Sequence, residues 1–156
     1  KKYGYRIKYV LHPIVSAQVN DFDRNDYVDI IPAVGDMSYE TMFRESSLMV
    51  TDFSGIQFDF AYMRKPLVYL HHKDIPQHYE EGTFFYDTMA FGEIAHDNDE
   101  LIELLCEYMA NGCKMKDEYV RRADDFFYYN DHNNCKRIYE IMVDYQKKKV
   151  LPYCHI

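Results

Sequence analysis

Short apolar runs alternate with amphipathic stretches along the first two thirds of the chain. The apolar runs have the length and the content of β-branched and aromatic residues expected of buried strands, and they cover residues 6–11, 27–31, 48–51, 67–70 and 93–95. Residues 37–47 and 56–64 have the periodicity of helices. We expect the second helix to end before Pro66, because the helical conformation is disfavoured for a residue that precedes a proline. This alternation predicts an α/β fold with a mostly parallel sheet.

The last third of the chain has helical periodicity and no strand signal, and it predicts helices over residues 98–110, 116–128 and 134–148. Asp97 and Glu100 have the spacing of a capping box at the start of the first helix, and Gly112 closes it. We therefore expect a single domain over residues 1–156, with an α/β core at about 6–96 and a helical tail at 97–150.

Polar residues follow several of the predicted strands. In an open parallel sheet, ligands bind beyond the carboxyl ends of the strands. His12, the pair Thr51-Asp52 and His71 all stand at such ends. The connection after His71 runs to about Phe91, and connections of this length in compact domains are often functional. These positions predict a binding site at one edge of the sheet.

Composition and charge narrow the classes of partner. Hydrophobic residues make up 47% of the chain, which excludes a disordered protein. The formal net charge is -8, from 26 acidic and 18 basic residues, so we expect no nucleic-acid partner, because neutralising phosphates requires clustered Lys and Arg. A small phosphorylated ligand remains compatible with this charge, since a few local groups can hold it.

The cysteines and histidines give little sign of a redox or metal site. Cys106, Cys113, Cys135 and Cys154 include no C-x-x-C pair, which favours reduced thiols in a cytosolic protein. His71, His72 and His78 match no zinc pattern, so we expect no metal site.

No apolar run approaches the ~18 residues of a membrane span, and no signal peptide is visible.

The sharpest local pattern is a buried strand that runs through a turn directly into a helix, over residues 48–60. Ser54 and Gln57 have the spacing of a capping box, and Gly55 allows a ligand to approach the first helical turn closely. Free amides at such a turn favour a diphosphate, and the hydroxyls of Thr51 and Ser54 add donors. The alternative is an ordinary turn in which Ser54 only caps its helix.

His12 precedes a proline at the end of the first strand. A neutral imidazole in a cleft can act as a general base or bind a phosphate oxygen, although a turn residue explains the same pattern. The chain has no G-x-S-x-G elbow, no Walker A loop and no G-x-G-x-x-G. Their absence argues against P-loop kinases and dinucleotide oxidoreductases.

The run from Val50 to Gly55, continued by Phe58-Asp59-Phe60-Ala61-x-x-x-Lys65-Pro66, resembles the signature T-D-Y-S-S-x-x-x-D-x-A-x-x-x-[RK]-P of the CDP-glycerol glycerophosphotransferases. This family includes the priming and polymerising enzymes of teichoic acid synthesis. The resemblance extends over about residues 6–143, through His12-Pro13, the segment from Gly82 to Asp87, Phe91-Gly92-Glu93, the run from Asp99 to Ile102, and Asn130-Asp131-His132-Asn133-x-x-x-Arg137.

The resemblance implies one half of a glycosyltransferase-B architecture, in which two Rossmann-like domains face each other across a cleft. This chain looks like the C-terminal, nucleotide-binding half, which is expected to be inactive without the missing N-terminal domain. The implied reaction transfers glycerol phosphate, or a related polyol phosphate, from a CDP-activated donor to a hydroxyl of a lipid-linked polymer or glycan, and CMP leaves. No cofactor beyond the donor substrate is implied. A cytoplasmic protein, peripheral at the inner face of the cell membrane, is expected.

The resemblance also assigns residues. His12 matches a histidine that faces the reacting phosphate, and the pyrophosphate cradle matches Thr51, Asp52, Phe53, Ser54, Gly55 and Gln57. Ser38 and Tyr39 are candidate base or ribose contacts because they stand near strand ends. Two departures bear on the substrate: Gly55 stands where many members have a second serine, and Glu81 stands where many have an arginine. A Glu there would repel a phosphate.

Two other functions remain open from the residues. One is a nucleotide-binding module without turnover, which the departures at Gly55 and Glu81 motivate. The other is one half of a glycosyltransferase that uses the same architecture with UDP- or GDP-sugars.

Overall fold

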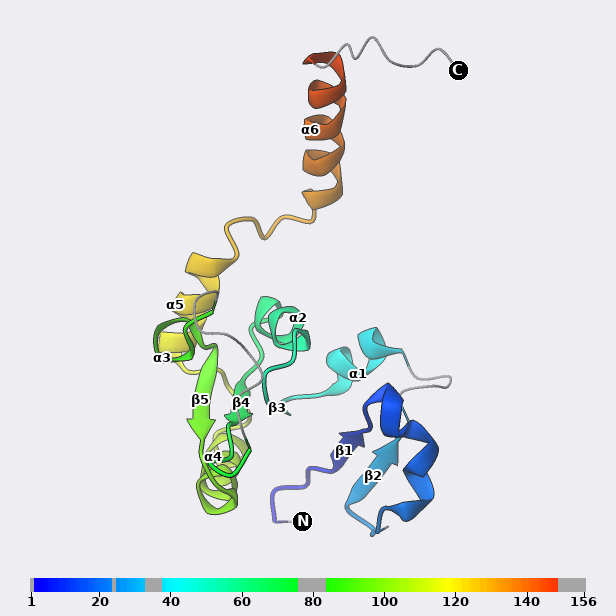
Figure 1. Cartoon of the computed structure of the whole chain (residues 1–156). Coiled ribbons are helices and arrows are strands. Elements are labelled where there is room, and N and C mark those ends of the chain that lie inside the picture. Colours follow the sequence, from blue (N-terminus) through cyan, green and yellow to red (C-terminus); the bar gives the residue numbers. More distant parts are fainter. Residues whose placement is uncertain (1, 24, 33–37, 76–83, 149–156) are drawn as a thin grey trace. The chain divides into compact units, whose positions relative to one another are not determined.

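The computed structural model describes residues 2–23, 25–32, 38–75 and 84–148. The chain forms two compact units, residues 1–123 and 124–156. All the strands of the described residues lie in the first unit (Figure 1). The division falls within a helix of the C-terminal third, and the predicted boundary between core and tail near residue 97 stays a prediction.

The strands among the described residues are all parallel and form two small sheets. In one sheet β1 (Ile7–Val10) pairs with β2 (Val28–Ile31). In the other, β4 (Leu67–Leu70) lies between β3 (Met49–Thr51) and β5 (Gly92–Ala95), as Figure 1 shows. The predicted α/β class with parallel strands is confirmed. Among the described residues the parallel strands are divided between a two-stranded and a three-stranded sheet, a division that the sequence did not specify.

Strand β4 is the centre of the core. Leu67, Val68 and Tyr69 are all 0% exposed, as expected for a parallel strand covered on both faces. Helices α2 (Ile56–Tyr62) and α4 (Asn98–Ala110) pack against it. Burying these three side chains stabilises the fold by about 2 kcal/mol each.

The predicted helices are present, and two short ones were not predicted. α4 and α6 (Asn134–Lys148) cover their predicted residues. α1 (Tyr39–Glu45), α2 and α5 (Asp117–Phe126) are shorter than predicted at one or both ends. The additional elements are a 3₁₀ helix, η1 (Pro13–Asp21), and a single turn, α3 (Tyr86–Met89), inside the predicted long connection.

The predicted cap of α4 is confirmed with a shift of one residue. The Asp97 carboxylate accepts hydrogen bonds from the amides of Asp99 and Glu100, both at 3.0 Å. The Glu100 side chain accepts from the amide of His96 at 2.7 Å, one residue before the cap, where a capping box uses the amide of the cap residue itself. Both acidic groups therefore satisfy amides around the first turn.

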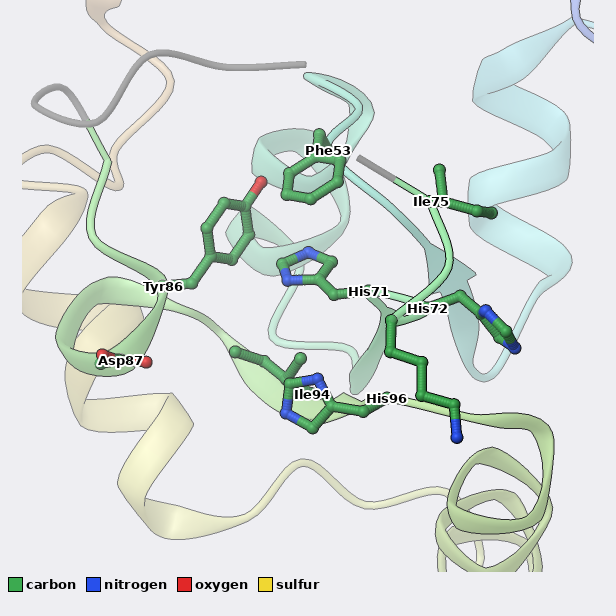
Figure 2. Close-up of a pocket in the computed structure, with 9 residues that line it drawn as sticks. Phe53, His71, His72, Ile75, Tyr86, Asp87, Ile94 and His96 are labelled. Carbon is green, nitrogen blue, oxygen red and sulfur yellow. The ribbon is translucent and has the colours of Figure 1, made fainter. Parts of the chain in front are cut away.

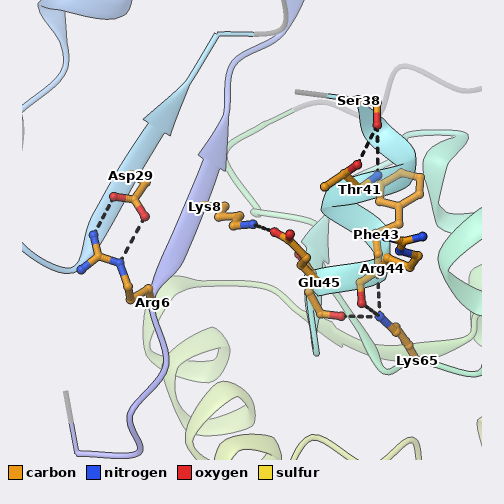
Figure 3. A network of polar contacts seen from close by, with 10 residues as sticks. Arg6, Lys8, Asp29, Ser38, Thr41, Phe43, Arg44, Glu45 and Lys65 are labelled. Carbon is orange, nitrogen blue, oxygen red and sulfur yellow. Dashed lines mark hydrogen bonds and ion pairs between the residues drawn. The ribbon is translucent and has the colours of Figure 1, made fainter. Parts of the chain in front are cut away.

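A network of charged groups fixes α1 to its neighbours (Figure 3). Arg6 pairs with Asp29 at 2.6 Å and joins β1 to β2, while Lys8 pairs with Glu45 at 2.6 Å and joins β1 to α1. At the carboxyl end of α1, the Lys65 ammonium donates to the carbonyl oxygens of Phe43 (2.6 Å), Arg44 (2.8 Å) and Ser46 (2.7 Å). Lys65 thus satisfies carbonyls that a helix end leaves unpaired.

The second unit contains α6 and the turn that leads into it. Asp131 accepts a hydrogen bond from the amide of Asn133 at 3.1 Å and pairs with Arg137, whose guanidinium lies 3.5 Å from the ring centroid of Tyr129. The hydrogen bond from Arg137 lowers the pKa of Asp131 to about 2. The segment from Asn130 to Arg137 that supports the family resemblance therefore forms the turn before α6 and the first turn of that helix.

Cys106, Cys113 and Cys135 are free thiols, and Cys154 lies outside the described residues. No helix within the described ranges has both the length and the apolar character that crossing a membrane requires.

Candidate functional site

A pocket of about 390 Å³ lies beyond the carboxyl ends of β3, β4 and β5 (Figure 2). The lining residues come from the ends of these strands and from the segments that directly follow them. Helix α3 contributes Tyr86 and Asp87. The lining consists of Phe53, His71, His72, Lys73, Ile75, Tyr86, Asp87, Ile94 and His96. This is the edge of a parallel sheet at which α/β proteins bind ligands.

One wall of the pocket is aromatic. The rings of Phe53 and His71 stack with their centroids 4.1 Å apart and an interplanar angle of 16°. The ring of Tyr86 stands perpendicular to both, 4.6 Å from His71 and 5.6 Å from Phe53. Two segments far apart in the sequence, the turn after β3 and the helix α3, therefore pack against the His71 ring.

His71 is the most unusual group of this wall. Its Nε2 atom is buried and has no hydrogen-bond partner among the described residues. Burial lowers the pKa of the imidazole, a hydrogen bond to the backbone of Asp52 opposes this shift, and nearby His96 lowers the pKa further. With a pKa below its ordinary value of 6.5, the ring is neutral at pH 7.

The remaining polar groups of the pocket are mainly nitrogen donors. His72, Lys73 and His96 line it together with one carboxylate, Asp87. His72 lies 3.6 Å from Asp74, so an ion pair forms when the imidazole is protonated. Lys73 and Asp87 carry opposite charges and the imidazoles add hydrogen-bonding nitrogens, so the pocket suits a polar ligand.

No group of three or more His, Cys, Asp or Glu side chains in the described part of the chain is arranged to hold a metal ion. Two residues weighed from the sequence, His78 and Glu81, lie outside the described residues.

The predicted capping box at the start of α2 is wrong. The cap residue is Gly55, no side chain caps the helix, and Ser54 does not take that role. The Gln57 side chain is 3% exposed and is held elsewhere: its Oε1 accepts from the Tyr69 hydroxyl at 2.7 Å, and its Nε2 donates to the Tyr86 hydroxyl at 3.4 Å. Gln57 therefore links the turn to β4 and to the wall of the pocket.

The turn before α2 is open to a ligand. A Cβ atom added to Gly55 would meet nothing within 4 Å. Gly55 has φ -62° and ψ -17°, which any residue adopts, so its backbone conformation does not require glycine. Thr51 ends β3 and is half-buried, whereas Asp52 is exposed. Phe53 is shared between this turn and the pocket.

The other predicted site residues stand apart from the pocket lining. His12 is exposed at the start of η1, where its Nδ1 accepts from the amide of Ile14 at 3.3 Å, so Nε2 is the nitrogen that it offers to a ligand. Ser38 caps α1 by accepting from the amide of Thr41 at 3.2 Å. Tyr39 is 44% exposed and packs against Phe43.

The structure adds pocket residues that sequence reasoning did not select. His96 directly follows the predicted strand 93–95, so the strand-end rule that selected His71 applies equally to it. Tyr86 and Asp87 belong to α3, and their contribution follows from the single turn that was predicted as loop.

The sequence model of the CDP-Glycerol:Poly(glycerophosphate) glycerophosphotransferase family matches residues 1–144. The chain belongs to this family. It is 37% identical over 150 residues to the "Minor teichoic acid biosynthesis protein GgaB" of Bacillus subtilis (strain 168). The match covers 96% of this chain but only 16% of that relative. No solved structure matches the chain.

Family membership confirms the resemblance inferred from the turn and the surrounding motifs. The residues that the family model matches include all the strands and the pocket at their carboxyl ends. The chain spans about a sixth of the length of the curated relative that it matches.

Proposed function

We propose that this chain is the donor-binding part of a transferase. The enzyme moves glycerol phosphate, or a related polyol phosphate, from a CDP-activated donor to a hydroxyl of a cell-wall or surface polymer. Membership of the glycerophosphotransferase family carries this proposal. The relative named for minor teichoic acid biosynthesis supports a polymer of that class as the product.

The chemistry requires the acceptor oxygen to attack the phosphorus that carries the polyol. The bond from that phosphorus to the bridging oxygen breaks, CMP leaves, and the proton of the acceptor hydroxyl passes to a base. His12 is the proposed group facing this phosphate, either as the base or as a stabiliser of its charge. Its Nδ1 accepts a backbone amide, so in the neutral ring Nε2 carries the hydrogen and can donate it to a phosphate oxygen. This arrangement favours the stabilising role, because a base needs a nitrogen with a free lone pair.

The donor diphosphate is proposed to lie against the turn from Thr51 to Gly55. Open space at Gly55 and the half-buried hydroxyl of Ser54 support this placement. Ser38 and Tyr39 at the start of α1 are proposed contacts of the base or ribose. The donor is a substrate, and no separate cofactor or metal is part of the proposal.

The remainder of the active site is proposed to come from another domain of a longer protein, so that this chain binds the donor without efficient transfer. This fits the small share of the curated relative that the chain covers. The acceptor is proposed to be a lipid-linked polymer or glycan at the inner face of the cell membrane.

A second candidate is a nucleotide-binding module without turnover. The residue that favours this candidate is Gly55, which lies in open space but has no side-chain hydroxyl where the family signature has a second serine. Such a module would bind CDP compounds while any longer protein that contains it released no CMP.

Calorimetric titration with CDP-glycerol, CDP-ribitol, CMP, UDP-glucose and GDP-mannose tests the proposed function. We expect preference for the CDP compounds. Ser54→Ala should weaken their binding about tenfold, because a hydrogen bond to a charged phosphate is worth about 1.5 kcal/mol. Ser47→Ala, an exposed hydroxyl outside the turn, is the matched control and should bind as the parent chain does.

Preference for UDP or GDP compounds would instead support a sugar-nucleotide glycosyltransferase half. Equal binding by the Ser54 and Ser47 variants would remove the turn from the proposed diphosphate site. Absence of binding to every compound would contradict donor binding by this chain.

A further inference from the structure

The buried Nε2 atom of His71 is a polar group without a partner among the described residues. Leaving such a group unpaired costs about 1–3 kcal/mol, and most buried polar atoms in folded proteins are paired. The atom belongs to a residue that lines the pocket at the ends of β3, β4 and β5. An unpaired atom in this position suggests a partner that arrives with a ligand.

The surroundings of His71 decide what kind of partner fits. The ring makes a hydrogen bond to the backbone of Asp52 that raises its pKa, so the ring is the donor in that bond. Because Nε2 has no partner, the donating nitrogen is Nδ1. Burial lowers the pKa and keeps the ring neutral, so Nε2 carries a lone pair and no proton. Its partner must therefore donate a hydrogen, which a fully ionised phosphate cannot do.

Two aromatic side chains pack against the ring inside the protein. Phe53 stacks on His71 at 4.1 Å, and Tyr86 meets it edge-on at 4.6 Å. A flat nucleobase would have to displace one of these rings to stack on the imidazole. The nitrogen edge is what His71 offers, and a hydroxyl group suits an acceptor of that kind (Figure 2).

The position of the pocket indicates which hydroxyl. Phe53 belongs both to the proposed diphosphate turn and to the pocket wall, so the two sites adjoin. Lys73 and His96 add nitrogen donors for an anion in the same pocket. The CDP-polyol of the proposed function has hydroxyls on carbon chains next to its phosphates, so it can reach both sites.

We infer that His71 is a donor-binding residue whose Nε2 accepts a hydrogen bond from a hydroxyl adjoining the diphosphate of the CDP-polyol. This inference rests on the proposed function. The polyol and the ribose both carry such hydroxyls, and they share the same chemistry at Nε2.

The first experiment compares His71→Phe, which keeps a stacking ring but removes the acceptor, with His71→Gln, whose amide oxygen can accept. Each variant is titrated with CDP-glycerol, CMP and glycerol 3-phosphate. His132→Asn, an exposed histidine in the second unit, is the control. We expect His71→Phe to weaken CDP-glycerol binding about fivefold, His71→Gln to restore most of the affinity, and the control to bind normally.

The three ligands separate the two sources of the hydroxyl. Weaker binding of CDP-glycerol and glycerol 3-phosphate, with CMP unchanged, identifies the polyol. Weaker binding of CMP and CDP-glycerol, with glycerol 3-phosphate unchanged, identifies the ribose. If the parent chain binds CDP-glycerol and His71→Phe binds it equally well, the inference is overturned while the proposed function stands. If the parent chain binds no CDP compound, the proposed function fails and the inference fails with it.

A second measurement does not depend on a variant that folds. Nitrogen NMR of the parent chain reports which ring nitrogen of each histidine carries the proton. We expect His71 to be protonated at Nδ1 only, with its Nε2 resonance shifting when CDP-glycerol is added. A proton on Nε2 in the free chain, or an Nε2 resonance that does not respond to a ligand shown to bind, would overturn the inference.

Discussion

At the scale of single residues, Lys65 shows how one side chain can organise a neighbouring helix. A lysine ammonium has three hydrogens to donate, and here three carbonyl oxygens at the end of α1 lie within 2.6–2.8 Å of it. Burial lowers the pKa of Lys65, yet the carbonyls favour its charged form. The residue therefore acts as a cap for a helix to which it does not belong.

Replacing Lys65 should destabilise the first unit. Lys65→Met removes every donor to these carbonyls, and we expect the free energy of unfolding to fall by about 2 kcal/mol. Lys65→Arg should recover part of the loss, because its planar fork cannot meet all the converging carbonyls equally. Urea denaturation measures both changes.

The matched control is Lys136→Met on α6, where the lysine side chain is 72% exposed and lies 3.9 Å from Glu140. A surface substitution of this kind should change stability by less than about 0.5 kcal/mol. Equal effects at Lys65 and Lys136 would contradict the capping role.

At the scale of elements, the pairing of β4 with β5 depends on a close approach at Gly92. A Cβ atom added there would lie 1.8 Å from the carbonyl oxygen of Leu67. That oxygen belongs to the central strand, which cannot move away without breaking its pairing with β3. Glycine is therefore required by space at this position.

Gly92→Ala should lower the free energy of unfolding by more than about 4 kcal/mol, because β5 must separate from β4 to admit the methyl group. Gly55→Ala is the comparison, since open space surrounds Gly55 and its backbone is helical. This substitution should change the free energy of unfolding by less than about 1 kcal/mol. Thermal unfolding followed by circular dichroism distinguishes the two. A mild effect at Gly92 would show that the strands tolerate a wider spacing.

Periodicity was sufficient to predict most elements of this fold. Residues 67–70 form a continuous apolar run with a proline before it, and β4 covers those residues. The 3₁₀ helix η1 escaped prediction because Pro13–Asp21 has no clear apolar face, and α3 because a single turn leaves almost no periodic signal. Pairing of the strands into two sheets depends on long-range contacts that periodicity does not encode.

The candidate site was predictable only in part. Strand-end position selected His71, which lines the pocket, because that rule depends only on the residues next to each strand. The capping box failed because Ser54 and Gln57 have the right spacing, while the buried hydroxyl of Tyr69, twelve positions later, provides a better partner for Gln57. The Phe53–His71 stack could not be foreseen, since it joins residues from different strand ends.

At the scale of the whole molecule, the stability of the fold depends on pH because the pKa values of some groups change on folding. The pKa of His71 is lower in the folded chain than in the unfolded chain. The imidazole therefore binds a proton more readily when the chain is unfolded. The stabilisation is fully present above the ordinary pKa of 6.5 and is lost as pH falls below it. Asp131 acts in a lower window, since its folded pKa of about 2 lies below its ordinary 3.8.

We therefore expect the free energy of unfolding to decrease between about pH 8 and about pH 5, before most carboxylates titrate. His71→Phe should flatten this decrease, whereas His132→Asn should leave it unchanged. Denaturation curves at a series of pH values measure the slopes. A parent slope of zero in this range would contradict a lowered pKa of the half-buried His71.

The role of Lys65 changes what the T-D-[YF]-S…[RK]-P pattern can be used for. Its basic residue fastens a helix end through backbone atoms and has no hydrogen left for a substrate. A sequence search based on this pattern therefore detects an architecture, and the identity of the sugar alcohol must be sought elsewhere. Under the donor-binding function proposed above, attempts to redesign donor choice should begin at the pocket residues Phe53, His71 and Lys73, and leave the signature lysine alone.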